Sequence, residues 1–373
     1  MHRSTRCCIK ILPRRASVTD MKKILVLRFS AMGDVALMVP VIRSLVAEHK
    51  DVEVTIVTRP RFAPFFAGIE RVVVFDADVD QKFKGFFGIR QLFRALILKK
   101  NFDVIVDLHD HLRTVILRNL FKIFGKRVIV FDKGRKEKKA FSRKDNKITK
   151  PLPHTVERYH KAFENAGFQF KLLQPPYLLP TEESKKLIEA WFVKKELVKN
   201  EKWIGIAPFA MHKSKIWPVA NYPKVIDSIL KKMPAKFFLF GGGDEEIQYF
   251  EDLQSLFPNN CIIVAGRLKL PQELTLMHHL DLMVCVDSSN MHLATLSNTP
   301  IMSIWGGTHP DVGFAPFGHN NKESVLQIGR EKLSCRPCSV YGRETCLRGD
   351  FACLNWITPE VVAQKILTRI SNP

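Results

Sequence analysis

The sequence predicts an α/β protein built from two doubly wound parallel-sheet domains that face each other across a cleft. Apolar runs of strand length alternate with segments of helical period along most of the 373 residues. Such near-continuous apolar strands are typical of parallel sheets that helices cover on both faces. A Pro-rich connector at 169–180 interrupts the alternation, which then starts again. The chain length also favours two domains rather than one.

The first domain is expected to span 21–180. Its strands are predicted from apolar runs at 24–29, 52–58, 71–75, 103–108 and 127–131. Segments of helical period lie between and after these runs, at 35–48, 86–99, 112–124 and 154–168. Gly167 suits the C-cap of the last of these helices.

The second domain is expected to span 181–357. Its predicted strands lie at 203–208, 236–242, 261–266, 282–287 and 300–306, and its predicted helices at 182–198, 220–232, 244–256, 271–279 and 289–297. The last segment, 358–373, holds one more amphipathic helix, with Thr358 as N-cap and Pro359 at the first helical position. We expect this helix to pack back across the two domains.

The composition indicates a globular protein, with 46% hydrophobic and 25% charged residues. No window approaches 18 consecutive apolar residues, so we predict no transmembrane helix. Residues 1–20 are basic but lack the apolar region of a secretory signal. We expect the folded part to begin at Met21, and 1–20 to be a disordered tail or an over-extended start. Eight cysteines without a signal peptide favour a reducing compartment over a disulfide framework.

About a third of the net charge of +21 lies in one place, because residues 133–150 hold nine Lys or Arg against two acids. This run is either a solvated, mobile loop or a landing site for an anionic partner such as nucleic acid, lipid headgroups or a phosphorylated glycan. Only Phe141 lies inside the run as an aromatic residue, whereas binders of single-stranded nucleic acid interleave several. Lipid is therefore favoured over nucleic acid.

The joint between the first predicted strand and the first predicted helix reads RFSAMGDVALMVPVIRSL (28–45). It places Gly33 and Asp34 at the carboxyl end of the strand, where doubly wound sheets bind their ligands. Gly33 permits a sharp turn and a close approach of substrate to the backbone. Asp34 is a helix N-cap, a general base for a hydroxyl in the cleft, or both.

Two joints in the second half supply a cation and an acid. Lys215 precedes Trp217-Pro218 and is either an ordinary surface lysine or a cation that neutralises a phosphate leaving group. Glu245 follows the glycines of FLFGGGDEE (238–246). It either interacts with the helix dipole alone or hydrogen-bonds a nucleoside base or ribose.

The joint VCVDSSNMHLATLSNTP (284–300) is the most informative of all. Asp287 ends a predicted strand, and Ser288 and Ser289 lie at the start of the next predicted helix. The free N–H groups of a helix start with small hydroxyl residues suit an anion. His292 lies in the first helical turn and is either a packing histidine or a ligand contact. The pattern suits a diphosphate on the helix tip, with Asp287 reaching a sugar.

Together these blocks resemble the lipopolysaccharide heptosyltransferases, glycosyltransferase family nine. The resemblance rests on 28–45, on KIWP (215–218) and on VDSSNMHLATLSNTPIMSIWGGT (286–308), whose order and spacing match from Met21 to about Thr368. It implies the GT-B fold, in which two Rossmann-like domains face a cleft. It also implies inverting, metal-independent transfer of a heptose from ADP-heptose to the lipopolysaccharide inner core, with no cofactor besides the nucleotide-sugar donor.

The resemblance also implies roles for single residues. Asp34 matches the proposed general base of the family, and Lys215 matches a lysine that meets the donor phosphates. Asp287 and His292 match a strand-end aspartate and a helix histidine on the donor side. Glu245 matches an acid near the nucleoside.

Two departures from the family pattern touch the donor pocket. Many members have Gly where this chain has Ser289, and members often have small polar residues where it has Ala210 and Met211. The donor therefore stays open between ADP-heptose and another nucleotide sugar, and a nucleotide-sugar epimerase of the same architecture is the second alternative. A basic nucleic-acid-binding protein is the third and is disfavoured by the pattern at the joints.

On the acceptor side, His109 and Arg113 of DLHDHLR (107–113) are either ordinary loop residues or contacts to acceptor carboxylates or phosphates. Gly33 would border the same acceptor. The basic run 133–150 would hold a lipid-linked anionic glycan near an anionic membrane surface. We therefore expect a cytoplasmic protein, peripheral on the inner face of the inner membrane, with no nucleic-acid partner.

Four cysteines near the end of the chain, Cys335, Cys338, Cys346 and Cys353, are spaced C-x2-C-x7-C-x6-C. Four thiols with one tight pair can bind structural zinc tetrahedrally. The spacing differs from the common zinc-ribbon patterns, so free thiols in a small lobe are the preferred interpretation and zinc the alternative.

Overall fold

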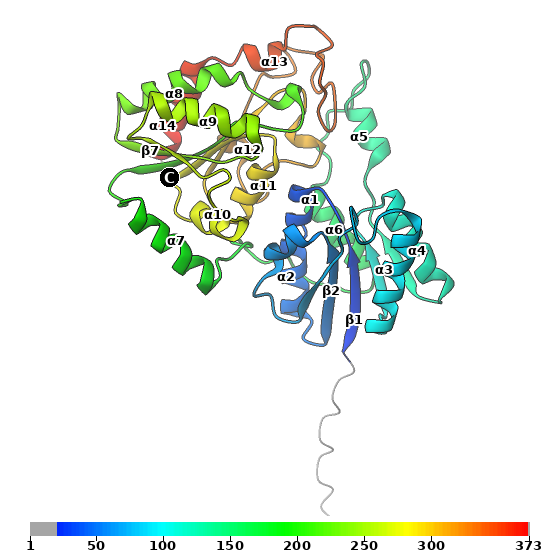
Figure 1. Cartoon of the computed structure of the whole chain (residues 1–373). Helices are drawn as coiled ribbons and strands as arrows, with labels where there is room; N and C mark the ends of the chain where they lie inside the picture. The colour runs from blue at the N-terminus through cyan, green and yellow to red at the C-terminus, as the bar shows by residue number, and fades with distance from the viewer. Residues whose placement is uncertain (1–20, 372–373) are drawn as a thin grey trace, which may run out of the picture.

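The computed structural model describes residues 21–371, and the expectations for residues 1–20 lie outside this range. Two α/β domains form two adjacent lobes (Figure 1). Each of the ten predicted strands overlaps an observed strand, so the predicted fold class is confirmed. Within the described range, no helix has both the length and the apolar character needed to cross a membrane.

The first domain is built on a five-stranded parallel sheet of order β3-β2-β1-β4-β5. The central strand β1 is apolar on both faces, because helices cover the sheet on both sides. The strands are β1 (Lys22–Leu27), β2 (Val52–Thr58), β3 (Val72–Asp76), β4 (Val104–Asp107) and β5 (Arg127–Val130). The helices are α1 (Met32–Ala36), α2 (Val39–Glu48), η1 (Pro60–Phe66), α3 (Gly85–Lys99), α4 (Leu112–Ile123), α5 (Arg135–Phe141) and α6 (Thr155–Asn165).

The predicted helix 35–48 is in fact two helices, α1 and α2. Pro40 lies in the first turn of α2. Proline has no N–H to donate and its ring crowds the preceding turn, so a continuous helix through this position is disfavoured. The break lets α1 take its own direction at the carboxyl end of β1.

The second domain is built on a six-stranded parallel sheet of order β11-β10-β9-β6-β7-β8. Its strands are β6 (Lys202–Ala207), β7 (Ala235–Leu239), β8 (Cys261–Ile263), β9 (Leu282–Val286), β10 (Ile301–Trp305) and β11 (Val325–Gln327). Its helices are α7 (Glu182–Lys194), η2 (Lys213–Lys215), η3 (Val219–Asn221), α8 (Tyr222–Leu230), α9 (Asp244–Leu256), α10 (Leu270–Met277), α11 (Ser289–Leu296), η4 (Pro310–Val312), α12 (Asn321–Ser324), α13 (Ala352–Asn355) and α14 (Pro359–Ser371). Strand β11 was not predicted, because its three residues are too few to show a period.

The C-terminal helix α14 does not pack back across the two domains as expected. It lies against α8 and β9 of the second domain. Its apolar stripe, Val362, Ala363, Ile366 and Ile370, is buried in the core of that domain. The stripe fits there because α8 offers a matching apolar face, with Val225, Ile226 and Ile229.

The basic run 133–150 is not the solvated loop that its charge suggested. It contains α5, whose residues Lys138 and Phe141 lie three positions apart on one face and are both buried. Beyond α5, Lys147 donates a hydrogen bond to the Ser334 carbonyl oxygen at 2.8 Å. The Arg330 guanidinium stacks on the Phe141 ring at 4.1 Å. The run therefore bridges the first domain to the second, as the position of α5 in Figure 1 shows.

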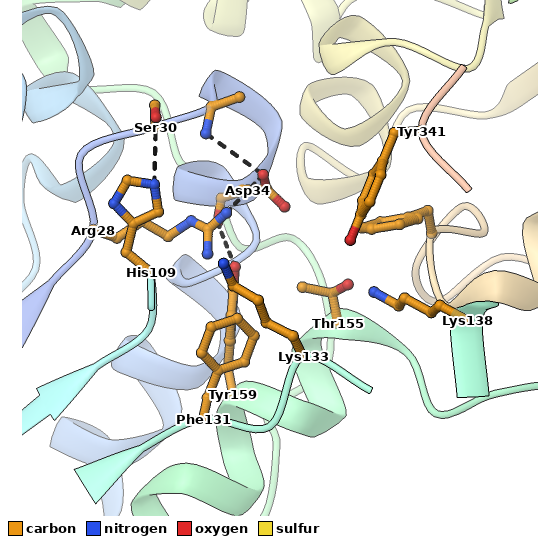
Figure 2. Close-up of a pocket in the computed structure, with 12 residues that line it drawn as sticks. Arg28, Ser30, Asp34, His109, Phe131, Lys133, Lys138, Thr155, Tyr159 and Tyr341 are labelled. Carbon is orange, nitrogen blue, oxygen red and sulfur yellow. Dashed lines mark hydrogen bonds and ion pairs between the residues drawn. The ribbon is translucent and has the colours of Figure 1, made fainter. Parts of the chain in front are cut away.

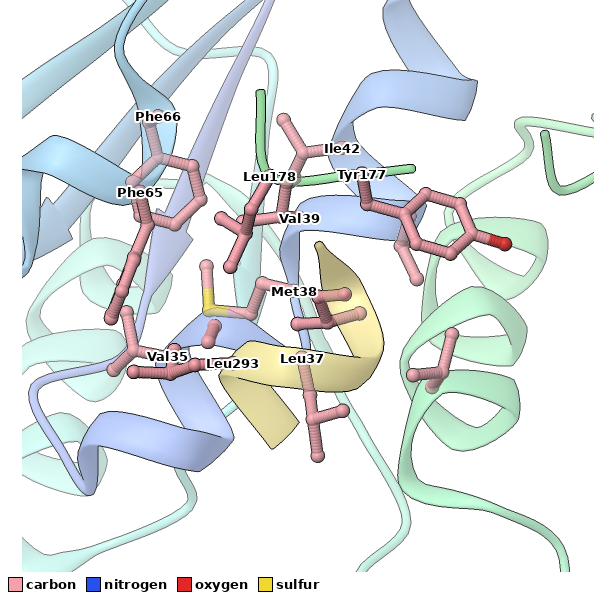
Figure 3. Packing of buried hydrophobic residues seen from close by; sticks show 14 of the residues in the cluster. Val35, Leu37, Met38, Val39, Ile42, Phe65, Phe66, Tyr177, Leu178 and Leu293 are labelled. Atoms are coloured by element: carbon pink, nitrogen blue, oxygen red, sulfur yellow. The ribbon is translucent and has the colours of Figure 1, made fainter. Parts of the chain in front are cut away.

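One hydrophobic cluster is continuous between the two domains. Helix α1 packs against α11, and Figure 3 shows Leu293 of α11 among Val35 and Met38 of the first domain. On the same side, the backbone N–H groups of Tyr177 and Leu178, in the connector, both donate to the Leu296 carbonyl oxygen, at 2.7 and 3.0 Å. The two lobes are thus fixed to each other at the carboxyl ends of β1 and β9.

The substitution Ile366→Ala tests the packing of α14. Ile366 is buried in the second-domain core, so its truncation leaves a cavity and should lower the free energy of unfolding by about 2–5 kcal/mol. Val361→Ala, on the exposed side of the same helix, should change it by less than about 0.5 kcal/mol. Urea denaturation of both variants measures the difference, and equal effects would contradict the packing.

Candidate active site

The turn after β1 holds an ion pair between Asp34 and Arg28. Arg28 is buried, donates to the Leu108 carbonyl oxygen and lies 2.6 Å from the Asp34 carboxylate. Asp34 is in the first turn of α1, where its carboxylate also accepts the Ala31 N–H at 3.5 Å. The predicted N-cap role of Asp34 is therefore wrong, because Ala31 is the N-cap of α1; Asp34 is the third helical residue, whose carboxylate reaches back to the N-cap N–H.

Asp34 is held as a carboxylate. Burial favours its neutral form, but the charge of Arg28 and the hydrogen bonds from Ala31 and Arg28 outweigh burial and lower its pKa. Its side chain is still 30% exposed, and the exposed part faces a cavity of about 270 Å³. An ionised carboxylate that remains accessible is a competent proton acceptor.

This Asp34 cavity is lined mainly by the first domain and closed by the second. Figure 2 shows Lys138 and Tyr341 across the cavity from Asp34. Three cations surround the single carboxylate, so the cavity suits an anionic ligand that also carries a hydroxyl. The lining residues are Arg28, Ser30, Ala31, Asp34, His109, Phe131, Lys133, Lys138, Thr155, Tyr159, Phe314 and Tyr341.

Lys138 is the cation that joins the two domains at this cavity. Its ammonium lies 4.3 Å from the centroid of the Phe314 ring, which belongs to the second domain. Burial, together with the nearby Arg158 charge, lowers the pKa of Lys138 to about 8. The residue is therefore charged at neutral pH but close to titration.

Lys215 and Asp287 meet at the carboxyl edge of the second sheet. The Lys215 ammonium lies 2.9 Å from the Asp287 carboxylate, which also accepts a hydrogen bond from the Thr308 hydroxyl at 2.7 Å. Asp287 directly follows β9. The pair therefore lies beside the N-terminus of α11.

The tip of α11 carries polar atoms that have no protein partner. Ser288 is its N-cap, and both the Ser288 hydroxyl and the His292 Nδ1 are buried without a hydrogen bond to any described residue. Burial lowers the pKa of His292, although Asp287 and Asp34 act in the opposite direction, so the imidazole is neutral near pH 7. Free N–H groups and unpaired hydroxyls at a helix N-terminus suit an anionic ligand.

The two halves of the site touch at Gly33. A Cβ atom at this position would lie 2.8 Å from Cδ2 of His292 and 3.5 Å from the Ser289 Cα. Gly33 is thus required by space and not by an unusual backbone angle. This contact brings α1, which carries Asp34, to the tip of α11.

Of the other predicted site residues, His109 lines the Asp34 cavity, whereas Arg113 and Glu245 do not. His109 lines the cavity with its Nε2 3.5 Å from the Ser30 hydroxyl, and burial and the Arg28 charge lower its pKa to about 3, so it is a neutral polar contact. Arg113 does not line the cavity and pairs with Asp80 at 3.5 Å. Glu245 is exposed in the first turn of α9.

Glu246, the residue after Glu245, makes the hydrogen bond to the glycine turn. The Glu246 carboxylate accepts the Gly242 N–H at 2.8 Å, and burial raises the pKa of Glu246. Sequence reasoning missed Glu246, because Asp244, Glu245 and Glu246 are all acids in the first turn of α9. Only the helix geometry shows which of the three side chains points toward the glycine turn. Sequence reasoning also did not single out Lys138 within the basic run, although the spacing to Phe141 marks a buried helix face.

The four C-terminal cysteines are free thiols. Cys353 is buried in the second-domain core, and the Cys346 sulfur accepts the Phe351 N–H at 3.3 Å. Among residues 21–371, no three His, Cys, Asp or Glu side chains are grouped so that they could hold a metal ion. The zinc alternative for these four thiols stays a prediction.

Two facing Rossmann-like domains, with a carboxylate from one and a helix tip from the other at the cleft, define a glycosyltransferase of the GT-B class. The model of "Glycosyltransferase family 9 (heptosyltransferase)" matches residues 89–342. The chain belongs to this family.

Relatives and solved structures agree with the assignment. The chain is 23% identical to the lipopolysaccharide core heptosyltransferase OpsX of Haemophilus influenzae, over 88% of this chain and 91% of the relative. A family 9 glycosyltransferase structure from Veillonella parvula superposes with a TM-score of 0.73 at 17% identity, covering 95% of this chain and 98% of the other. The ADP-heptose lipopolysaccharide heptosyltransferase II of Escherichia coli gives 0.67 at 19% identity, over 94% and 98%.

Removing Arg28 should reveal its effect on Asp34. In Arg28→Met the burial of Asp34 remains while the compensating positive charge is lost, so the pKa of Asp34 should rise above its usual value of about 3.9. Carboxyl ¹³C NMR titration, with Asp34→Asn to assign the signal, measures the shift. Arg113→Met, whose arginine pairs with Asp80, is the matched control and should leave Asp34 unchanged.

Proposed function

We propose that this glycosyltransferase moves a heptose from ADP-heptose to the inner core of lipopolysaccharide, with inversion and without a metal. Membership of the heptosyltransferase family supports the donor class, and the relatives named for lipopolysaccharide support the acceptor. The observation that carries the proposal is the convergence of the ionised Asp34 with the tip of α11 through the Gly33–His292 contact.

The donor diphosphate is assigned to the tip of α11. Ser288 and Ser289 would offer their backbone N–H groups and hydroxyls to it, and His292 Nδ1 is free to join them. Lys215 would neutralise charge that builds on the leaving phosphate, while Asp287 holds its ammonium and reaches toward the sugar. Glu245, exposed beside the glycine turn, is assigned to the nucleoside.

The acceptor is assigned to the Asp34 cavity. Asp34 would take the proton of the acceptor hydroxyl as its oxygen attacks the anomeric carbon, from the face opposite the diphosphate. Because Arg28 keeps the carboxylate ionised, the base needs no prior deprotonation near neutral pH. Gly33 and His109 border this position, and Lys138 would bind an anionic group of the acceptor. Arg113 would contact the acceptor only outside the cavity, where its partner is Asp80.

The proposed location is the inner face of the inner membrane, where a lipid-linked acceptor is reached from the cytoplasm.

The alternatives to the proposed function are a transferase with another nucleotide-sugar donor or a nucleotide-sugar epimerase. Thermal-shift measurements with ADP-, UDP-, GDP- and CMP-sugars test the donor class without an acceptor. Stabilisation by ADP-heptose alone supports the proposal. Stabilisation by a different sugar nucleotide, or donor conversion without any acceptor, contradicts it.

The variant Asp34→Asn tests the general base. Loss of the proton acceptor should lower kcat by about 10²–10⁴-fold. Affinity for ADP-heptose, measured by calorimetry, should stay within a few-fold because the donor contacts lie on α11. Asp80→Asn, at an exposed ion pair outside the cavity, is the control and should keep kcat near the wild-type value. A near-normal kcat in Asp34→Asn would refute the assignment.

The variant Lys138→Gln tests the anion-binding role of the basic run. Loss of the buried charge should raise the acceptor KM by about ten-fold or more and leave the donor KM unchanged. In the wild type the acceptor KM should rise as pH increases through about 8, because the ammonium that binds the anion is lost there. Lys138→Arg should remove this dependence. Lys136→Gln, exposed on the same helix, is the control, and an equal effect there would argue against the assignment.

A further inference from the structure

The outer surface of the first domain exposes large apolar side chains on two neighbouring helices. On α3, Phe87 is 81% and Leu98 is 85% exposed, and on α4, Ile123 is 78% exposed. Helices α3 and α4 pack against each other at the side of the first domain that faces away from the second (Figure 1). Large exposed apolar side chains that gather on one face mark an interaction surface.

These side chains are not needed for the core beneath them. The buried faces of the two helices, with Ile89, Leu92 and Leu96 from α3 and Leu117 and Phe121 from α4, already form a complete cluster under the sheet. Phe87 and Leu98 lie eleven positions apart, so they share one face of α3 and point away from that cluster. Arg90 and Arg94 lie on the same face between them.

The surface is cationic as well as apolar. Helices α3 and α4 together contain six Lys or Arg and no Asp or Glu. Arg90, Arg94 and Lys122 are exposed and form no ion pair with any residue of 21–371. Unpaired cations beside exposed apolar side chains are the composition of an interfacial, anionic-membrane surface.

We propose that the α3/α4 face, defined by Phe87, Arg90, Arg94, Leu98, Lys122 and Ile123, docks on an anionic lipid bilayer. The apolar side chains enter the boundary between headgroups and acyl chains, and the cations meet the anionic headgroups. A second copy of the chain does not fit, because a two-fold interface would set cations against cations. Nucleic acid is the competing occupant, because the Phe87 ring can stack on a base; the aliphatic Leu98 and Ile123 cannot, and they favour the bilayer.

Docking on the α3/α4 face would orient the Asp34 cavity relative to the bilayer. The N-termini of α3 and α4 follow the carboxyl ends of β3 and β4, and these lie at the same edge of the sheet as Asp34. A bilayer on the α3/α4 face would therefore run toward the mouth of the Asp34 cavity. The inference rests on the proposed function, because the purpose of docking would be to bring a lipid-linked acceptor to Asp34. It also replaces the run 133–150, part of which is bound to the second domain, as the landing surface.

The test is sedimentation of the full-length chain with vesicles of phosphatidylethanolamine and phosphatidylglycerol at 3:1. Phe87→Ser/Leu98→Ser/Ile123→Ser should reduce the vesicle partition coefficient at least ten-fold. Arg90→Gln/Arg94→Gln/Lys122→Gln should reduce it on these vesicles and remove the difference from pure phosphatidylcholine. The control Val193→Ser/Val198→Ser/Leu256→Ser changes comparably exposed residues of the second domain and should stay within two-fold of wild type.

The outcomes separate this inference from the proposed function. Equal binding of the apolar variant and the wild type overturns the inference, as does a wild-type dimer that the apolar variant dissociates. The inference is also overturned if nucleic acid displaces the wild type from vesicles and does not displace the charge variant. Transfer to a water-soluble, deacylated acceptor should be unchanged in the apolar variant. If the wild type transfers no heptose at all, the proposed function fails while the vesicle result still stands.

Discussion

The contact between Gly33 and His292 is the constraint on which the rest of the site depends. A side chain at position 33 would collide with the imidazole, so only glycine lets α1 come this close to α11. Asp34 is the next residue, and its position relative to the α11 tip is set by this contact. The apolar cluster around Leu293 fixes the same two helices from behind. The packing of the two domains and the position of Asp34 are therefore two consequences of one close approach.

Charge is divided between the two sides of this contact. On the side of the first domain, Arg28 stabilises a carboxylate that burial alone would neutralise, while Lys138 adds a cation whose own charge burial weakens. On the side of the second domain, Lys215 is paired with Asp287, and the tip of α11 adds a buried hydroxyl and an imidazole nitrogen without a partner among the described residues. The charges therefore suit two different anionic ligands, one on each side of the contact, with a hydroxyl of one ligand lying between them.

The high net charge of the chain has several separate uses. Part of the basic run 133–150 lines the Asp34 cavity, and part of it ties the first domain to the second through Lys147 and Ile148. The unpaired cations of α3 and α4 lie on a different surface. A charge total therefore says little about which surface meets which partner, since pairing and burial decide how much of each charge solvent and ligands experience.

The sequence by itself determined the two-domain parallel-sheet fold and the residues at the strand–helix joints, because both follow from local periodicity and from the rule that ligands bind at the carboxyl edge. Family membership was also evident from the blocks around Asp34, Lys215 and Asp287. Only the tertiary structure decided that Lys138 enters the cavity, that Arg113 stays outside it, and that Phe314 and Tyr341 close it. Those placements depend on how two domains meet, and a periodic pattern within one segment holds no information about a partner that lies some 200 residues away.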